Sequence, residues 1–197
     1  MEKVLESLNL AQKIPKMLLH SCCAPCSSYV LQVLSDFFDI TVFYYNPNIS
    51  PIEEYELRKE EQKRLIKSLN FKNRVDFLDC AYENYEFENI SKGLESEPER
   101  GKRCFKCYEL RLRKTAEMAK NLNYEFFTTT LTVSPYKNAE WINQIGENLS
   151  KKYDVNYLVT DFKKNDGYKK SIELSKKYNL YRQNFCGCKF SKEHYKK

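Results

Sequence analysis

The chain has 197 residues, and 33 lysines and arginines against 27 aspartates and glutamates give it a formal net charge of +6. Hydrophobic residues make up 42% of it and aromatic residues 14%, which is more buriable surface than a disordered chain carries. Five scattered glycines exclude the G-x-G-x-x-G motif and the P-loop, and two histidines exclude a histidine-rich metal site, so the eight cysteines are expected to carry the chemistry.

The first twenty residues contain two glutamates and lack the continuous apolar run and small-residue cleavage site of a signal peptide. No stretch approaches the roughly 18 apolar residues that a membrane span needs. We therefore expect a cytoplasmic protein with no membrane partner. In that reducing compartment, clustered cysteines bind metal or do redox chemistry more often than they form structural disulfides.

Short apolar runs alternate with longer amphipathic segments along the chain. The pattern predicts a buried strand over 16–20, a helix over 27–37 and a strand over 40–45. A long charged helix follows to about residue 69, with Ser50 as N-cap, Pro51 at its first position and Glu53 closing a capping box. The later segments are predicted as strands over 75–78, 124–130 and 156–160 and helices over 104–121, 138–152 and 166–178.

Strands separated by helices of this length predict an α/β fold, a mainly parallel, doubly wound sheet of about five strands. No internal repeat or linker interrupts the pattern, so we expect a single domain over residues 1–197. Ligands of such sheets bind beyond the carboxyl ends of the strands. The first cysteine cluster directly follows the first strand and Cys80 follows the third, which predicts an active edge lined with cysteine.

The eight cysteines fall into three groups and one single residue. These are Cys22-Cys23-Ala24-Pro25-Cys26, Cys104-Phe105-Lys106-Cys107, Cys186-Gly187-Cys188 and Cys80. Two C-x-x-C pairs supply four thiolates, enough for a tetrahedral zinc or a four-iron cluster. The spacing favours the pair Cys23 and Cys26 together with the 104–107 pair, and it does not say which metal is held.

The Cys186-Gly187-Cys188 group differs from the other two. One intervening residue is tight for a shared metal, whereas glycine gives the backbone freedom that a small disulfide ring requires. Strained disulfides tend to be the catalytic ones, so we interpret this group as a redox dithiol. Cys80 stands alone at a strand end and fits an ordinary buried thiol.

Basic residues and aromatic residues lie together near the second and third cysteine groups, a composition that suits a nucleic-acid ligand as well as a plain solvated surface. The basic residues are Arg100, Lys102, Arg103, Lys106, Arg111, Arg113, Lys114, Lys189, Lys192, Lys196 and Lys197, and the aromatic ones are Tyr181, Phe185, Phe190 and Tyr195.

Five segments, taken in order and spacing, resemble the QueH-type epoxyqueuosine reductases, which perform the last step of queuosine biosynthesis in tRNA. The segments are HSCCAPCS at 20–27, YNPNI at 45–49, ERGKRCFKCY at 99–108, TTLTVSPYK at 129–137 and YRQNFCGC at 181–188. Together they extend over nearly the whole chain. The resemblance implies a nucleotide-hydrolase-like (Rossmann-like) sheet and a cobalamin-independent reduction of epoxyqueuosine to queuosine at the tRNA wobble position.

The resemblance also implies a division of labour among the cysteines. It assigns a [4Fe-4S] cluster to Cys22, Cys23, Cys104 and Cys107, with Cys22 in place of the Cys26 that the spacing favours. It assigns Cys186 and Cys188 to a redox-active disulfide, recharged by an unidentified electron donor. The family is associated with an additional iron ion, for which Cys26 and Asp79 are candidate ligands.

Two other functions compete with this interpretation. A zinc-stabilised, non-catalytic nucleic-acid-binding module would use the C-x-x-C pairs but would leave the Cys-Gly-Cys group without a role. An iron–sulfur enzyme that thiolates tRNA would need ATP and a glycine-rich pyrophosphate loop, which five scattered glycines do not provide.

Overall fold

The structure, a computed structural model, describes residues 1–194, with side chains up to Ser191. Five strands form one all-parallel sheet in the order β3-β2-β1-β4-β5. The strands are β1 (Lys16–His20), β2 (Asp39–Phe43), β3 (Val75–Leu78), β4 (Phe126–Thr129) and β5 (Asn156–Tyr157). The predicted α/β class and the parallel, doubly wound sheet are thereby confirmed.

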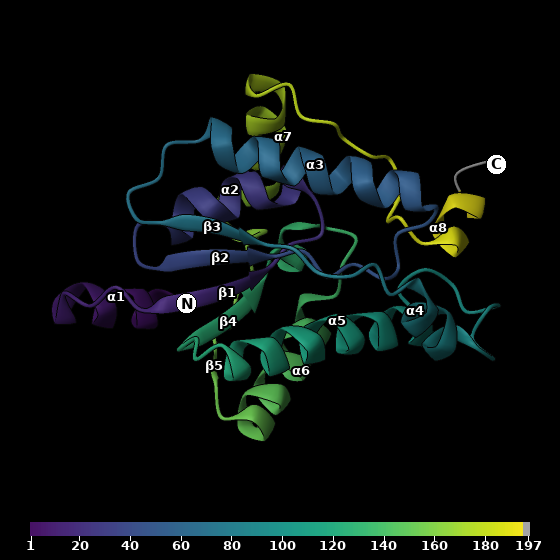
Figure 1. The fold of residues 1–197 in the computed structure, drawn as a ribbon, viewed down its shortest axis with the longest axis horizontal. Helices are drawn as coiled ribbons and strands as arrows, with labels where there is room; N and C mark the ends of the chain where they lie inside the picture. Colours follow the sequence, from purple (N-terminus) through teal and green to yellow (C-terminus); the bar gives the residue numbers. More distant parts are fainter. Residues whose placement is uncertain (195–197) are drawn as a thin grey trace.

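Helices cover both faces of this sheet, with α2, α3 and α7 on one side and α5 and α6 on the other (Figure 1). The helices are α1 (Glu2–Ala11), α2 (Ala24–Leu34), α3 (Ile52–Ser68), α4 (Asn84–Ser91), α5 (Lys102–Asn121), α6 (Ala139–Tyr153), α7 (Gly167–Lys177) and α8 (Lys189–His194), with short 3₁₀ turns at Thr130–Val133 and Lys164–Asp166. Within residues 1–194, none of these helices is long and apolar enough to cross a membrane.

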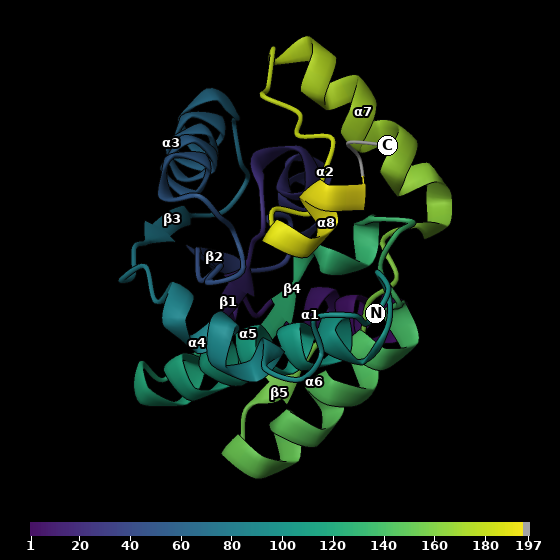
Figure 2. The ribbon, with the colours of Figure 1, turned by 90° about the vertical axis from the view of Figure 1, so that its right-hand side faces the viewer.

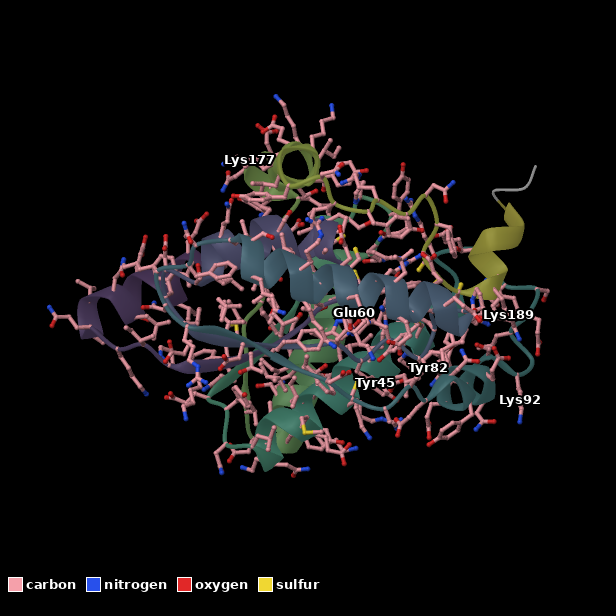
Figure 3. The ribbon with its side chains drawn as sticks, turned by 45° about the horizontal axis from the view of Figure 1, so that its top comes forward. Tyr45, Glu60, Tyr82, Lys92, Lys177 and Lys189 are labelled. Carbon is pink, nitrogen blue, oxygen red and sulfur yellow. The ribbon has the colours of Figure 1, made fainter. Side chains whose placement is uncertain are left out.

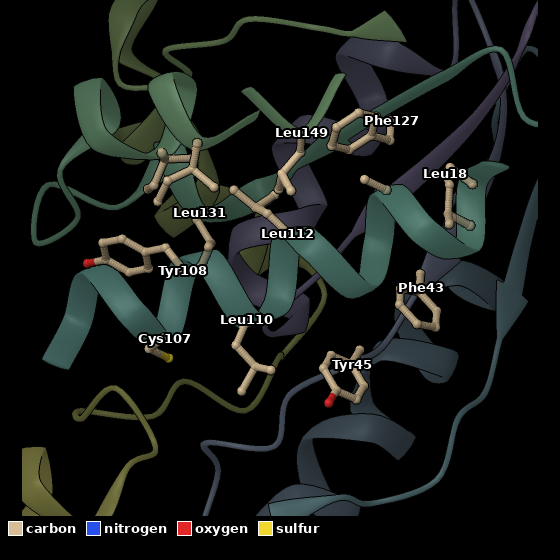
Figure 4. Close-up of a cluster of buried hydrophobic side chains, with 14 of the residues drawn as sticks. Leu18, Phe43, Tyr45, Cys107, Tyr108, Leu110, Leu112, Phe127, Leu131 and Leu149 are labelled. Carbon is tan, nitrogen blue, oxygen red and sulfur yellow. The ribbon is translucent and has the colours of Figure 1, made fainter. Parts of the chain in front are cut away.

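Each face of the sheet has its own hydrophobic core because successive strand residues point to opposite sides. In β1, Met17 and Leu19 pack into the core beneath α2 and α3, whereas Leu18 packs into the core beneath α5. Figure 4 shows the second core, in which Leu112 of α5 lies among side chains that include Phe127 of β4. The central strand is therefore held from both sides, and its carboxyl end has a fixed position.

The strand order places a topological switch point between β1 and β4. From β1 the chain builds outward to β2 and β3, and α5 then returns it to β4 on the other side of β1. Crossovers that diverge in this way leave a crevice at the carboxyl ends of the two central strands. Figure 2 looks onto this end of the molecule, where α8 lies in front of the strands.

Two predicted helix starts are wrong, and both errors concern the site. Helix α2 begins at Ala24 rather than at residue 27, because Cys23 takes the N-cap position and Pro25 fits the first turn, so Cys26 lies inside the helix. Helix α3 begins at Ile52 with Pro51 as N-cap and no side-chain cap. Ser50 does not close the predicted capping box, because its backbone N–H donates instead to the carbonyl of Gly187 at 2.9 Å.

The remaining differences are of length. The last strand ends at Tyr157 rather than at residue 160, and β2 and β4 are each shorter than predicted. Helices α1, α4 and α8 are not among the predicted elements. Val4, Leu5 and Leu8 do give α1 a helical apolar spacing, which the prediction does not use, whereas α4 has only 8 residues and buries just Phe87 and Ser91.

Candidate metal and redox site

His20, the last residue of β1, hydrogen-bonds to the end of β4 and to the segment that follows β2. Its Nε2–H donates to the carbonyl of Tyr45 at 3.1 Å, and its Nδ1 accepts from the Thr129 hydroxyl at 2.9 Å. Burial, helped by the nearby Arg111 charge, lowers the pKa of His20 to about 3, so the imidazole is neutral. His20 is therefore a structural clamp that fixes where the following cysteines begin.

The first cysteine group converges on one point directly after β1. The sulfurs of Cys22, Cys23 and Cys26 all lie within 4.8 Å of one another, and those of Cys22 and Cys23 are 3.7 Å apart. Within the described side chains, this is the one group of three or more metal-ligating residues so close together. The turn of α2 that Pro25 starts brings Cys26 back to Cys23, and the helix N-terminus favours negative charge there.

The second group lies at the start of α5. Cys104 is half-buried and Cys107 is buried, one turn later on the same helix, and Figure 4 shows Cys107 projecting from this part of α5. Burial raises the pKa of Cys107 to about 11. The structure does not bring these two sulfurs into the tight first group, but it places them in a neighbouring cavity.

Two cavities meet at this site. The main cavity, of about 130 Å³, is lined by residues that include Cys22, Cys23, Cys26, Arg111, Lys137 and Cys186. The second cavity is smaller and is lined by residues that include Cys104, Cys107, Cys186, Cys188, Arg111 and Lys137. Arg111, Lys137 and Cys186 line both, so segments about eighty residues apart in the chain share one set of walls.

Arg111 is the most unusual of these shared residues, because its guanidinium is buried without a carboxylate partner among the described residues. It is 1% exposed. Its Nε donates to the carbonyl of Cys107 at 3.3 Å and its Nη1 to Asn46 Oδ1 at 3.5 Å, while its Nη2 has no partner among the described side chains. No carboxylate of the described residues forms an ion pair with it. Burial opposes the charge on Arg111, whereas the nearby sulfurs of Cys107, Cys186 and Cys22 raise its pKa when they are thiolates, so the site favours negative charge.

The third cysteine group is held by a clamp on its backbone. Arg58, itself paired with Glu54 at 2.7 Å, donates through Nη1 to the carbonyl of Cys186 at 3.2 Å. The Cys186 N–H donates to Ser191 Oγ at 3.0 Å. Gly187 between the two cysteines has a φ of 110°, a conformation that favours glycine.

Cys80 and Asp79 lie apart from both cavities. The Cys80 thiol donates to the carbonyl of Tyr44 at 3.1 Å, and burial raises its pKa to about 11, as expected of an ordinary half-buried thiol. Asp79 pairs with Lys59 at 3.6 Å and with Lys63 at 3.5 Å and is half-exposed. The expectation that Asp79 joins Cys26 around a metal is therefore not supported by its position.

The predicted basic surface is partly wrong, because two of its arginines are buried. Arg111 faces the cavities, and Arg103 donates through Nη1 to the carbonyls of Leu94, Glu95 and Glu97 at 2.8, 3.0 and 2.7 Å. Lys189 stays at the surface (Figure 3), where it pairs with Glu88. Tyr195, Lys196 and Lys197 and the side chain of Lys192 lie outside the described residues.

In the sequence, Arg111 counts among the basic residues near the cysteines and Lys137 belongs to the family-like segment 129–137, but neither is given a place in the site, and Arg58 is missed. Arg111 lies four residues after Cys107, and this i, i+4 spacing on a helix is the one signal that places it beside the cysteine. Lys137 lies in a loop after the 3₁₀ turn that follows β4, and Arg58 is one of many charged residues of α3. For those two residues no local pattern distinguishes a buried cation from a solvated one.

A family model described as "Epoxyqueuosine reductase QueH" matches residues 17–194 of the chain. A protein of Streptococcus pyogenes named epoxyqueuosine reductase QueH is 44% identical over 179 residues, which cover 90% of this chain and 70% of the relative. A protein of the same name from Staphylococcus epidermidis is 44% identical over 181 residues, covering 90% of this chain and 76% of the relative.

A solved structure shares the fold at low sequence identity. It is described as a predicted subunit of tRNA methyltransferase from Methanocaldococcus jannaschii, and it superposes with a TM-score of 0.51 at 17% identity. The alignment covers 83% of this chain and 74% of that one. At this identity the likeness concerns the Rossmann-like architecture.

Proposed function

The chain belongs to the QueH family of epoxyqueuosine reductases, and on that premise we propose that it reduces epoxyqueuosine to queuosine at the wobble position of tRNA. The family's named activity is that of an oxidoreductase acting in tRNA processing. The reaction removes the epoxide oxygen as water, with two electrons and two protons. On this proposal residues 1–197 form one reductase domain, and no cobalamin takes part.

The observation that carries the proposal is the meeting of three cysteine groups around one buried guanidinium. Arg111 lines both cavities, and its Nη2 has no partner among the described residues. A four-iron cluster held by four thiolates is an anion, and such a group supplies the negative charge that Arg111 lacks. The donor set and the orphaned nitrogen therefore fit an iron–sulfur cluster.

We assign the cluster to Cys22 and Cys23 after β1 and to Cys104 and Cys107 on α5. Bound there, the cluster would supply one-electron transfer at a potential set by its surroundings. Cys26 lies with Cys22 and Cys23 in the tight sulfur group and remains the candidate ligand of the family's additional iron, now without Asp79. The number and identity of the metals belong to the proposal.

Cys186 and Cys188 are the proposed dithiol that supplies the two electrons. Two thiols release two electrons and two protons when they form a disulfide, which balances the removal of one epoxide oxygen as water. Support comes from the position of Cys186, which lines both cavities, and from the backbone clamp that holds the group at the site. An external reductant, whose identity is open, would restore the thiols.

The proposed macromolecular partner is tRNA with epoxyqueuosine in its anticodon loop. A single-stranded loop lets the modified base leave the stack at modest cost. Tyr136 lines the main cavity and is 52% exposed, and the guanidinium of Arg100 lies 5.7 Å from the centre of its ring. An exposed ring beside a cation suits a splayed base next to a phosphate.

A zinc-stabilised binding module remains the alternative. The 3.7 Å between the sulfurs of Cys22 and Cys23 is about the separation of two thiolates on one tetrahedral zinc. This alternative gives no role to the Cys186 group or to the cations around it. Metal analysis separates the two, because one zinc without iron or sulfide favours the module.

The test of the reductase proposal compares Cys104→Ser with Cys80→Ser in anaerobically purified protein. Cys104→Ser is expected to lose the brown chromophore, iron and sulfide together with the formation of queuosine in tRNA. Cys80→Ser removes a half-buried thiol that lines neither cavity and is expected to keep all four. A Cys104→Ser protein with full iron content and full turnover would contradict the ligand assignment.

A second variant tests the dithiol. Cys188→Ala is expected to retain the cluster and to fail in multiple turnover, because no disulfide can form. Nucleoside mass analysis of the tRNA measures the conversion. A wild-type rate for this variant would exclude the pair from the reaction.

A further inference from the structure

Lys137 is a buried lysine whose ammonium lies against a cysteine sulfur. Its side chain is 10% exposed, and its Nζ is 3.0 Å from the Sγ of Cys186. The one carboxylate that the structure pairs with it, Glu99, is 3.9 Å away. Lysine is rarely buried unless paired, so the partner that justifies this position is Cys186 rather than Glu99.

The two cysteines of the pair are not equivalent in their surroundings. Cys186 is half-buried and lines both cavities, whereas Cys188 is 7% exposed and lines only the second. Lys137 lines both cavities as well, so its ammonium faces the same space as the Cys186 sulfur. A substrate in the main cavity therefore meets Cys186 and Lys137 and does not meet Cys188.

The charges reinforce this asymmetry. The Cys188 thiol, together with the Lys137 ammonium and the Arg111 guanidinium, holds the pKa of Cys186 well below its usual value. The pKa of Cys188 is raised in turn by its hydrogen bond to Cys186 and by burial. Burial opposes the charge on Lys137, but the Cys186 thiolate raises its pKa above the usual value. The directions of these pKa changes favour a thiolate at Cys186, a thiol at Cys188 and an ammonium at Lys137.

Resting on the proposed function, we propose that Lys137 makes Cys186 the thiolate of the pair and donates a proton to the departing epoxide oxygen. The geometry that points to this role is the 3.0 Å contact at a wall shared by both cavities. The reaction needs two protons. With Cys186 as a thiolate, one of them is on the Lys137 ammonium and the other is on the Cys188 thiol.

The step balances with these groups alone. Both C–O bonds of the epoxide break and a C=C bond forms, while the sulfurs of Cys186 and Cys188 are oxidised to a disulfide. The oxygen leaves as water with one proton from the Lys137 ammonium and one from the Cys188 thiol, and Lys137 becomes a neutral amine. An external dithiol then reduces the disulfide and returns the thiolate, the thiol and the ammonium.

The first test measures which cysteine is the thiolate, without any turnover. Reduced protein is treated with iodoacetamide over a pH series, and the tryptic peptide 183–189, which contains both cysteines, is sequenced by mass spectrometry. Cys186 is expected to react first at neutral pH. Lys137→Met is expected to raise the pKa of Cys186 by about one unit, which slows that reaction about tenfold at pH values below both pKa values.

Matched variants separate the two parts of the role. Lys189→Met removes a lysine next to Cys188 that pairs with Glu88 at the surface, and it is expected to leave the alkylation of Cys186 unchanged. Lys137→Arg is expected to keep Cys186 reactive, because it keeps the charge, but to lose epoxide reduction, because a guanidinium does not release its proton.

Three results would overturn the proposal: prior alkylation of Cys188 in the wild type, a wild-type alkylation rate in folded Lys137→Met, and full turnover in Lys137→Arg. The first and third do not depend on whether the Met variant folds. These results differ from failure of the reductase proposal itself, which would show as no queuosine formed by the iron–sulfur-loaded wild type while Cys186 still reacts first with iodoacetamide.

Discussion

Replacing Arg111 with methionine should change the stability of the metal-free protein and the retention of the cluster in opposite directions. The guanidinium is 1% exposed, its two hydrogen bonds of 3.3 and 3.5 Å are long, and its Nη2 forms none with residues 1–191. Without a bound anion, no carboxylate of the described residues offsets this charge. A hydrophobic residue of similar volume relieves that cost.

Replacing a buried ion pair with apolar residues of similar volume stabilises other proteins by about 1–4 kcal/mol. Arg111→Met removes one buried charge but also the 3.5 Å hydrogen bond to Asn46 Oδ1, so we expect the low end of this range. At about 2–4 °C per kcal/mol for a chain of this size, the Tm of the metal-free protein should rise by at least about 2 °C. The reconstituted variant should meanwhile bind less iron and sulfide than the wild type. Thermal unfolding and metal analysis measure the two effects on the same preparation.

Arg103→Met is the matched control, because Arg103 is equally buried on the same helix but donates to three carbonyls and lies 4.2 Å from the centre of the Phe190 ring. Its loss strands those acceptors and should destabilise the protein by about 2–5 kcal/mol. If metal-free Arg111→Met is destabilised as much as Arg103→Met, the guanidinium is compensated by the protein itself and the inference of an anionic occupant falls.

Three further changes probe other parts of the site. Gly187→Ala places a Cβ 3.0 Å from both Arg58 Nη1 and Ile49 Cγ1 at a φ of 110°, so it should lower the free energy of unfolding by about 1–3 kcal/mol. The control Gly93→Ala, whose Cβ meets nothing within 4 Å, should cost about 1 kcal/mol, and equal costs would argue against the backbone contacts of Arg58. Tyr136→Ala should raise KM for tRNA about tenfold through lost stacking, and an unchanged KM would remove the ring from the binding surface. The Arg64 guanidinium and the Tyr181 N–H hold the pKa of the Glu61 carboxyl below its usual value, so its contribution to stability is present above about pH 4.3 and is lost as pH falls through the folded pKa. Chemical unfolding should therefore show the difference in unfolding free energy between wild type and Glu61→Gln shrinking over that acid range. A difference that stays constant with pH would argue against the pairing.

The sequence predicts the sheet well because its signals are local. Apolar runs such as the one in β1, together with the spacing between them, are enough to expect parallel strands, and the position of Cys22 and Cys23 directly after β1 is enough to place them at the carboxyl edge. The start of α2 is missed because a cysteine N-cap followed by a proline is a weaker signal than the serines at 27 and 28.

The electrostatics of the site could not be predicted in the same way. Arg103, Arg111 and Arg113 are all arginines of α5 and look alike in the sequence. The first two are nevertheless buried and the third is exposed. Only the packing of α5 against the sheet and the C-terminal segment distinguishes them. The pairing of Lys137 with Cys186 joins residues 49 positions apart and depends on where β4 ends, which no local pattern reveals.

The most direct test of the account is a single turnover by anaerobic, iron–sulfur-loaded, fully reduced protein on tRNA that contains epoxyqueuosine, with no added reductant. Nucleoside mass analysis counts the queuosine formed, and peptide mapping counts the Cys186–Cys188 disulfide. We expect the two to form together in a ratio of about one to one, as the electron balance of the disulfide requires. Queuosine formed while the pair stays reduced, or no queuosine from the fully loaded protein, would contradict it.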